Sequence, residues 1–311
     1  MQKKPACFAC AGFLLLTFEP PAYAQPAPNS SWMRADQGKI LLTAGFADAE
    51  GAAGGGLVPW ALITGYGSRD SFGANAHLTT VQLPDFDLKA YGVGVGLFDR
   101  VELSYTKHEL DVTGTALDGL GVKQDIFGLK LRLLGDAVYS QDLWIPQVAV
   151  GAEYKKNNGL DDGGSVGNAA LVNPKQLGAD DDRGVDYYLS ATKVFLAQSF
   201  LVNATVRYTN ANQFGLLGFG GDRETGRSWE PEVTAAYLFN RRTAVGVEYR
   251  SKPENLSVDT EEDAWDAFVA WAPTKNLSLV AAYLNLGSIL GPVTGSTQKQ
   301  DGLYLSFQAG F

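Results

Sequence analysis

The sequence predicts an all-β protein, a transmembrane antiparallel up-and-down β-barrel of about 14 strands. Three observations lead to this class: apolar and polar residues alternate from Lys39 onward, the N-terminus has the pattern of a secretory signal, and short connections alternate with long ones. The 36 glycines follow no G-x-y period, which excludes collagen, and the many aromatic and β-branched residues exclude a disordered chain. A formal net charge of −9 argues against a nucleic-acid partner.

Residues 1–24 have the three parts of a signal peptide. Two lysines near the start precede an apolar stretch that ends at Phe18 and an A-x-A cleavage site that ends at Ala24. The apolar stretch is too short, and lies too close to the cleavage site, for a transmembrane helix. After cleavage, residues 25–38 are expected to form a periplasmic tail and residues 39–311 the outer-membrane β-barrel.

The alternation divides the rest of the chain into segments of barrel-strand length. The expected strands lie near residues 40–48, 57–67, 72–82, 86–97, 100–110, 121–134, 143–155, 185–196, 199–210, 228–239, 242–251, 263–272, 277–287 and 302–311. The first two fit the pattern least well. The alternative is a barrel of 12 strands, in which the N-terminal segment Gly51–Gly67 folds inward as a plug.

The connections between these segments predict the topology. Short links lie at Pro273–Asn276, Asn240–Arg241, Ala197–Gln198 and Phe98–Arg100, and long links lie at Lys252–Glu262, Ala211–Arg227 and Lys156–Gly184. Short periplasmic turns that alternate with long external loops are typical of outer-membrane barrels. An even number of strands then lets both chain ends lie in the periplasm.

The last strand carries an expected assembly signal. Leu303, Leu305, Phe307 and Phe311 alternate with polar or small residues, and the printed chain stops at Phe311. A terminal phenylalanine on such a strand resembles the signal that the barrel-assembly machinery of bacterial outer membranes reads. We therefore expect Phe307 and Phe311 to form that signal.

Charged residues of the expected strands fall on one face only, which fits a polar lumen and a lipid-facing exterior. The predicted pore-lining residues are Lys130, Arg132, Arg207, Glu230, Glu232, Glu248, Arg250 and Asp266. Opposite charges on neighbouring strands pair favourably, so one interpretation is a structural ladder of ion pairs. The other is a charged constriction that sets ion selectivity, and the two are compatible.

The other motifs predict neither a catalytic site nor a metal site. The glycine cluster from Gly51 to Gly56 lacks the Lys-Ser/Thr of a phosphate loop, which favours a tight external turn or backbone that passes close to the barrel wall. Ser104 and His108 share a face, as in a lipid-modifying wall enzyme, but at ~3.3 Å per residue they stand about 13 Å apart along one strand, beyond hydrogen-bond reach. The acidic loop from Lys156 to Gly184 lacks EF-hand spacing, so a solvated external loop is favoured over a divalent-cation site.

Three segments resemble one proteobacterial family. They are EGAAGGGLVPWALITGYGSRD from Glu50, YGVGVGLFDRVELSY from Tyr91 and KQDIFGLKLRLLGDAVYSQDLWIPQVAVGAEYKKN from Lys123. The family is number 3034 among the domains of unknown function, and the resemblance extends from about Lys39 to Phe311. It implies an outer-membrane barrel, no established activity and no site residues that could be transferred to this chain.

The sequence as a whole predicts a passive porin-like channel or uptake protein for small solutes in the outer membrane of a Gram-negative bacterium. Two alternatives remain open: a closed structural or surface barrel without transport activity, and a lipid-modifying barrel enzyme. The expected partners are outer-membrane lipid and lipopolysaccharide, the barrel-assembly machinery and small solutes. No cofactor, metal ion or catalytic residue is expected.

Overall fold

The computed structural model describes residues 39–43, 46–113, 120–158, 165–166, 169–171, 173–294 and 298–311. The expected signal peptide, residues 1–24, and the expected periplasmic tail, residues 25–38, lie outside the described residues. None of the described helices is both long and apolar enough to span a membrane.

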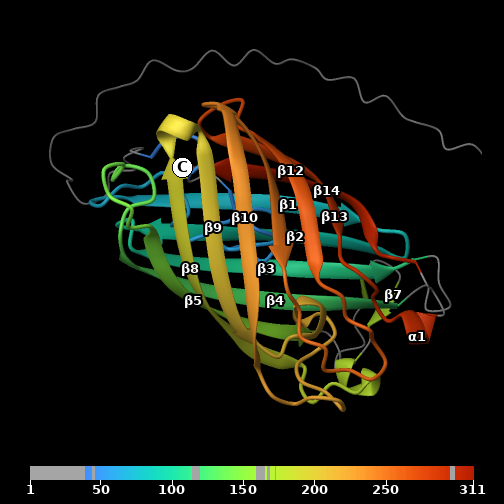
Figure 1. Ribbon diagram of the computed structural model, residues 1–311. Coiled ribbons are helices and arrows are strands. Elements are labelled where there is room, and N and C mark those ends of the chain that lie inside the picture. Colours follow the sequence, from blue (N-terminus) through green and yellow to red (C-terminus); the bar gives the residue numbers. More distant parts are fainter. Residues whose placement is uncertain are drawn as a thin grey trace, which may run out of the picture. The chain divides into compact units, whose positions relative to one another are not determined.

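Within the described residues, twelve antiparallel strands form a closed barrel wall (Figure 1). The wall strands are β1 (Phe72–Gln82), β2 (Phe86–Leu97), β3 (Val101–Val112), β4 (Leu120–Leu134), β5 (Gln147–Asn158), β8 (Arg183–Phe195), β9 (Phe200–Thr209), β10 (Ser228–Asn240), β11 (Thr243–Arg250), β12 (Ala264–Trp271), β13 (Leu277–Asn285) and β14 (Asp301–Gly310). Each pairs with its neighbours along the chain, and β1 closes the barrel on β14 from Asn75↔Gly310 to Gln82↔Leu303. Closure leaves no unpaired sheet edge, which is the condition for a sheet to exist in lipid.

Six short elements lie in the connections. They are β6 (Ser165–Val166), β7 (Ala169–Leu171), η1 (Pro174–Leu177), η2 (Leu196–Gln198), η3 (Asn212–Gly215) and α1 (Gly291–Thr294). Of these, β7 extends the sheet locally by pairing with the start of β4.

Among the described residues the wall has twelve strands, so the alternative with an inward-folded N-terminal segment is correct. The described residues of the segments near 40–48 and 57–67 form no wall strand. Residues 39–43 and 46–67, here called the plug, run through the lumen instead. The reason is visible in the side chains: Val58, Ala61 and Ile63 are all at most 1% exposed. A lipid-facing strand must expose every second side chain, and this segment exposes almost none.

The wall strands are apolar outside and polar inside. On β4, Leu129 and Leu131 are 51% and 43% exposed, whereas Lys130 between them is 1% exposed. Aromatic side chains form rows across the outer face, for example Tyr187, Tyr208 and Trp229 on three adjacent strands. In a water-soluble protein the apolar side chains lie inside and the polar ones outside. Here the order is reversed, as expected for a barrel whose outer face contacts lipid hydrocarbon.

The plug enters and leaves the barrel at the same end. We call this the turn end, because the short connections β2–β3, β8–β9, β10–β11 and β12–β13 lie there. At the start of the plug, the Lys39 ammonium contacts the Asp99 carboxylate in the β2–β3 turn at 2.9 Å. At its end, the Tyr66 backbone N–H donates to the Phe311 carbonyl at 2.7 Å. The opposite end, here called the loop end, carries the long β5–β8, β9–β10, β11–β12 and β13–β14 connections. Two connections depart from this division, because the short link at residues 83–85 lies at the loop end and the longer one at residues 135–146 lies at the turn end.

Candidate functional site

The lumen is the candidate site, and two segments fill it. The plug fills it from the turn end. From the loop end it is covered by residues 212–217, here called the lid, which contain η3 and belong to the long β9–β10 connection. Five of the six lid residues are buried, and only Phe214 is partly exposed. A solute that crosses this barrel must therefore pass both closures.

A group of buried charges joins the plug to the wall in the loop-end half of the lumen. We call it the ion belt, and it consists of Glu50 from the plug and Glu153, Lys155, Asp186, Arg207, Glu232 and Arg250 from the wall. Each of these side chains is at most 4% exposed. Because charges lose their hydration in such a place, each must be compensated by a partner.

Arg207 is the hub of the wall part of the belt. Its Nε lies 2.5 Å from the Glu232 carboxylate and its Nη1 lies 2.6 Å from the Glu153 carboxylate. Its guanidinium also lies 3.6 Å from Glu50 and from Asp186. Four carboxylates from three wall strands and the plug thus converge on one cation.

Glu50 is the only plug residue in the belt. Its carboxylate accepts from Arg250 Nη1 at 2.7 Å, is bonded to the Lys155 ammonium and faces Arg207. One plug side chain therefore meets three wall cations, which come from β5, β9 and β11.

The belt also contains a set of oxygens that could suit a metal ion. Oxygens of Glu50, Glu153 and Asp186 lie within 4.8 Å of one another. The Lys155 ammonium lies between them, 2.7 Å from Asp186 and 3.5 Å from Glu153. Since lysine supplies the positive charge at this point, the arrangement is an ion-pair cluster and gives no argument for a metal site.

A second group of contacts holds the glycine-rich part of the plug. The Glu102 carboxylate accepts from the backbone N–H groups of Ala53, at 3.0 Å, and Thr64, at 2.7 Å. The Glu248 carboxylate accepts from the Leu57 N–H at 2.7 Å. A Cβ at Gly55 would overlap that same carboxylate. Of the two roles expected for the glycine cluster, the structure shows backbone that passes close to the wall.

The predicted pore-lining residues are all buried, but they do not form one ring. Lys130, Arg207, Glu232, Glu248, Arg250 and Asp266 point toward the plug or its anchors. Arg132 lies at the turn end, paired with Asp99 and Asp136. Glu230 lies nearer the loop end, where it accepts from Ser228 and Ser251. Their role in a pore stays a prediction.

Sequence reasoning missed five belt or anchor residues: Glu50, Glu102, Glu153, Lys155 and Asp186. Four of them carried a usable signal, because they occupy the polar positions of alternating strands, as Glu153 does beside the outward-facing Tyr154. Glu50 carried none. It stands next to the glycine cluster in a segment without alternation, and only the folded chain brings it to the wall.

Charged residues of the β11–β12 loop hold the lid in place. The Lys252 ammonium donates to Gln213 Oε1 at 2.9 Å, and the Glu261 carboxylate accepts from the Gln213 backbone N–H at 2.7 Å. Burial lowers the pKa of Lys252, and burial together with the nearby Asp259 raises the pKa of Glu261 to about 8. Gln213 and its neighbour Phe214 have φ values of 43° and 61°, a strained backbone for side chains of this size.

The other residues that the sequence singled out, His108, the acidic loop, Phe307 and Phe311, have few specific contacts. His108 lies in the lumen and contacts the Ala49 carbonyl through Nε2 at 2.7 Å, so its ring helps to hold the plug. In the described part of the acidic loop, Asp181 and Asp182 pair with Lys175 and Arg183. Phe307 and Phe311 point outward and are 58% and 54% exposed. Their role in assembly stays a prediction.

Comparisons with known proteins give one family match and several structural similarities. The chain matches the family described as "Protein of unknown function (DUF3034)" over residues 43–308. No curated protein sequence matches it. Among solved structures it is similar to the KdgM porin, with 6% identity, a TM-score of 0.45 and coverage of 76% of this chain and 99% of that chain. The NanC porin has 9% identity, a TM-score of 0.44 and coverage of 76% and 97%. The COG4313 outer membrane channel from Pseudomonas putida F1 has 13% identity, a TM-score of 0.43 and coverage of 77% and 94%.

Proposed function

The chain belongs to the DUF3034 family, and we propose that it is an outer-membrane uptake channel for small solutes whose lumen is closed at rest by its own plug. The observation that carries this proposal is the way in which the plug is attached. It enters and leaves at the turn end and is held in the lumen by ion pairs and hydrogen bonds, with Glu50 at the centre. Such a segment can shift toward the turn end without breaking a wall strand.

The outer face of the wall indicates the surroundings in which the barrel lies. An apolar outer face with aromatic rows suits outer-membrane lipid and lipopolysaccharide, and the turn end, where the plug enters, then faces the periplasm. We further propose that the barrel-assembly machinery recognises β14 through the outward-facing Phe307 and Phe311. Small solutes enter from the loop end, past the lid.

The plug is the gate in this proposal. A wall of twelve strands that encloses a complete chain segment surrounds enough space for a solute path once that segment moves. The polar groups that Glu50 leaves behind, on Arg207, Arg250 and Lys155, would line that path. Conduction therefore requires that the contacts of Glu50 be broken.

A second candidate function, a closed structural barrel, is favoured by the completeness of the two closures. The experiment that separates the two candidates is single-channel recording in planar bilayers with the wild type and Glu50→Ala. A channel protein gives rare openings in the wild type and frequent openings in the variant. A matched control is Glu254→Ala, which removes the exposed partner of Arg223. If all three proteins stay silent at every voltage while folded, the barrel is structural and the channel proposal is wrong.

A further inference from the structure

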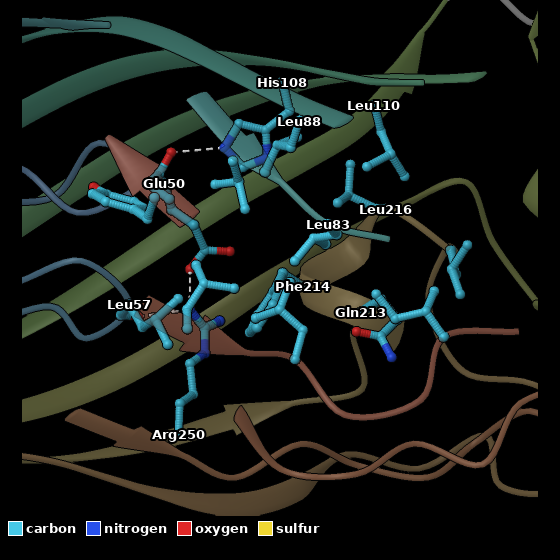
Figure 2. A pocket seen from close by; sticks show the side chains of 17 residues that line it. Glu50, Leu57, Leu83, Leu88, His108, Leu110, Gln213, Phe214, Leu216 and Arg250 are labelled. Carbon is cyan, nitrogen blue, oxygen red and sulfur yellow. Dashed lines mark hydrogen bonds and ion pairs between the residues drawn. The ribbon is translucent and has the colours of Figure 1, made fainter. Parts of the chain in front are cut away.

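A cavity of about 50 Å³ lies between the plug and the lid in the loop-end half of the lumen. Its lining is unexpected for a channel that passes polar solutes, because eleven of its seventeen residues are aliphatic. They come from several elements that are distant in sequence, among them Leu57 of the plug, Leu88 and Leu110 of the wall, and Leu216 of the lid. Figure 2 shows Leu83, Leu110 and Leu216 on the side of the cavity that faces away from Glu50.

The charged residues at the edge of the cavity are already satisfied by one another. The Arg250 guanidinium binds Glu50 at 2.7 Å and the Leu57 carbonyl at 3.0 Å, and it stacks on the Phe214 ring with 4.3 Å to the centroid (Figure 2). Gln213 is bonded to Lys252. These contacts already engage the charged groups at the edge, and most of the remaining lining is aliphatic, so the body of a ligand must be mostly hydrocarbon.

Two polar atoms of the lining differ from the rest, because neither His108 Nδ1 nor the Tyr304 hydroxyl group has a hydrogen-bond partner among the described residues. His108 is 2% exposed. Its Nε2 contacts the Ala49 carbonyl at 2.7 Å, and because a carbonyl can only accept, Nε2 carries the proton. In the neutral ring Nδ1 is then an acceptor, and a buried acceptor without a donor is costly. A ligand hydroxyl supplies that donor.

The size and the mobility of the site complete the description. At about 10–15 Å³ for each water molecule, the cavity has room for only a few waters, and an apolar void of this kind tends to stay dry. A ring-sized ligand requires the lid to move outward. The positive φ values of Gln213 and Phe214 indicate that the lid stores strain, which its outward movement would release.

The geometry points to this cavity as the binding site for a small, mostly hydrocarbon molecule of about the size of one aromatic ring that carries one hydroxyl group donating to His108 Nδ1. This inference rests on the proposed function and names its substrate class. The ligand passes the lid, is held between lid and plug, and leaves when the plug shifts. Hydrophobic contact provides the affinity, and His108 provides the selection for a hydroxyl group.

The probes that test it are 4-fluorophenol and fluorobenzene, which differ in the hydroxyl group. Binding to the full chain in lipid nanodiscs is followed by ¹⁹F NMR, with empty nanodiscs as the reference for partition into lipid. We expect saturable binding of both probes, with 4-fluorophenol bound about tenfold more tightly. In His108→Phe the preference should disappear while fluorobenzene still binds, a change that a purely structural role of His108 would not produce.

Two variants fill the cavity, Leu110→Trp and Leu284→Trp, so that one remains if the other fails to fold. We expect that neither variant binds 4-fluorophenol or fluorobenzene. Leu129→Trp adds the same group to the lipid-facing surface, where Leu129 is 51% exposed, and should keep both. Absence of saturable binding in the wild type, or binding that persists in the folded cavity-filled variants, overturns the site. Equal affinities for the two probes overturn the assignment of the hydroxyl group.

These outcomes separate the inference from the channel proposal. Binding is measured on the closed protein without a gradient, whereas gating is measured by conductance of Glu50→Ala. If Glu50→Ala conducts but the wild type binds neither probe, the channel proposal stands and the substrate class is rejected. Binding without conductance keeps the site and rejects transport.

Discussion

The guanidinium of Arg250 donates to the carboxylate of Glu50 at 2.7 Å, although the two residues are 200 positions apart in the chain. This contact joins the plug to β11 inside the lumen. Both side chains are at most 4% exposed, so the pair is shielded from salt and water. The behaviour of the closed barrel should therefore depend on Glu50 far more than on any exposed charge.

Glu50→Gln removes the charge of Glu50 and leaves Lys155, Arg207 and Arg250 with one carboxylate fewer. Breaking a buried ion pair costs about 3–5 kcal/mol, so we expect a clearly lower melting temperature. Calorimetry of the folded barrel in detergent measures it. Glu254→Gln, which breaks the exposed pair with Arg223, should change stability by less than about 1 kcal/mol. Equal melting temperatures for the two variants would contradict the role of Glu50 as an anchor.

Gly55→Ala tests the close approach of plug and wall. The added methyl group would overlap the Glu248 carboxylate, which is buried and already accepts from Leu57 and Thr234. We expect a lower melting temperature and more frequent channel openings than in the wild type. Gly226→Ala is the control, because its Cβ would lie 3.0 Å from the exposed Glu224 side chain, which can move. Unchanged stability of Gly55→Ala would show that the plug is not held tightly at this point.

Replacement of both Arg207 and Arg250 by Ala tests the predicted pore lining. In the closed barrel, Glu50, Glu153 and Glu232 lose their main partners, and the melting temperature should fall by more than in Glu50→Gln. In a Glu50→Ala background, where openings are frequent, the same double change should make the pore more cation-selective. The reversal potential across a salt gradient measures this, with the largest shift at low salt, where screening is weakest. The double variant Arg183→Ala/Arg223→Ala, which changes exposed arginines, is the control. Unchanged selectivity would show that these side chains do not line the conducting path.

Deletion of Phe311 tests the assembly signal. Phe311 is 54% exposed, and its backbone forms hydrogen bonds with the backbone of Tyr66 and Ala74. We expect the shortened chain to accumulate in the periplasm or to be degraded. Fractionation and the heat-modifiable mobility of folded barrels measure this. Phe311→Tyr keeps the aromatic ring and should assemble normally, and normal amounts of folded barrel after the deletion would reject the signal.

The lid should loosen as the pH rises. The pKa of Glu261 is raised from an ordinary value of 4.5 to about 8 by burial, in surroundings that also hold Lys252, Asp259 and Glu230. A raised folded-state pKa contributes stability that is fully present below pH 4.5 and is lost as the pH rises through about 8. Hydrogen exchange of residues 212–217, corrected for intrinsic rates, should therefore show less protection at pH 8.5 than at pH 5.5. Glu261→Gln cannot ionise and should show a much smaller difference. An equal difference in both proteins would assign the effect to another group.

The positions of the wall strands could be predicted from the sequence, because a strand that separates lipid from a polar lumen must alternate at every second residue. The strand around Arg207 shows this: Val206 and Tyr208 face outward and Arg207 faces inward, as the alternation predicts. The same rule located the charged residues of β9 to β12. It located most strand ends to within one or two residues, because turns and loops break the alternation, but the strand expected near 143–155 lies at Gln147–Asn158.

What only the tertiary structure decided is how the lumen is filled. The plug, the lid and Glu50 have no periodic signal, because a segment surrounded by wall on all sides has no polar face and no apolar face to alternate. The meeting of Glu50 with Arg250, and of Leu57 with the leucines of the wall and the lid, depends on the closure of β1 on β14. Local alternation determines which side of a strand faces lipid, whereas contacts across the lumen exist only after the barrel has closed.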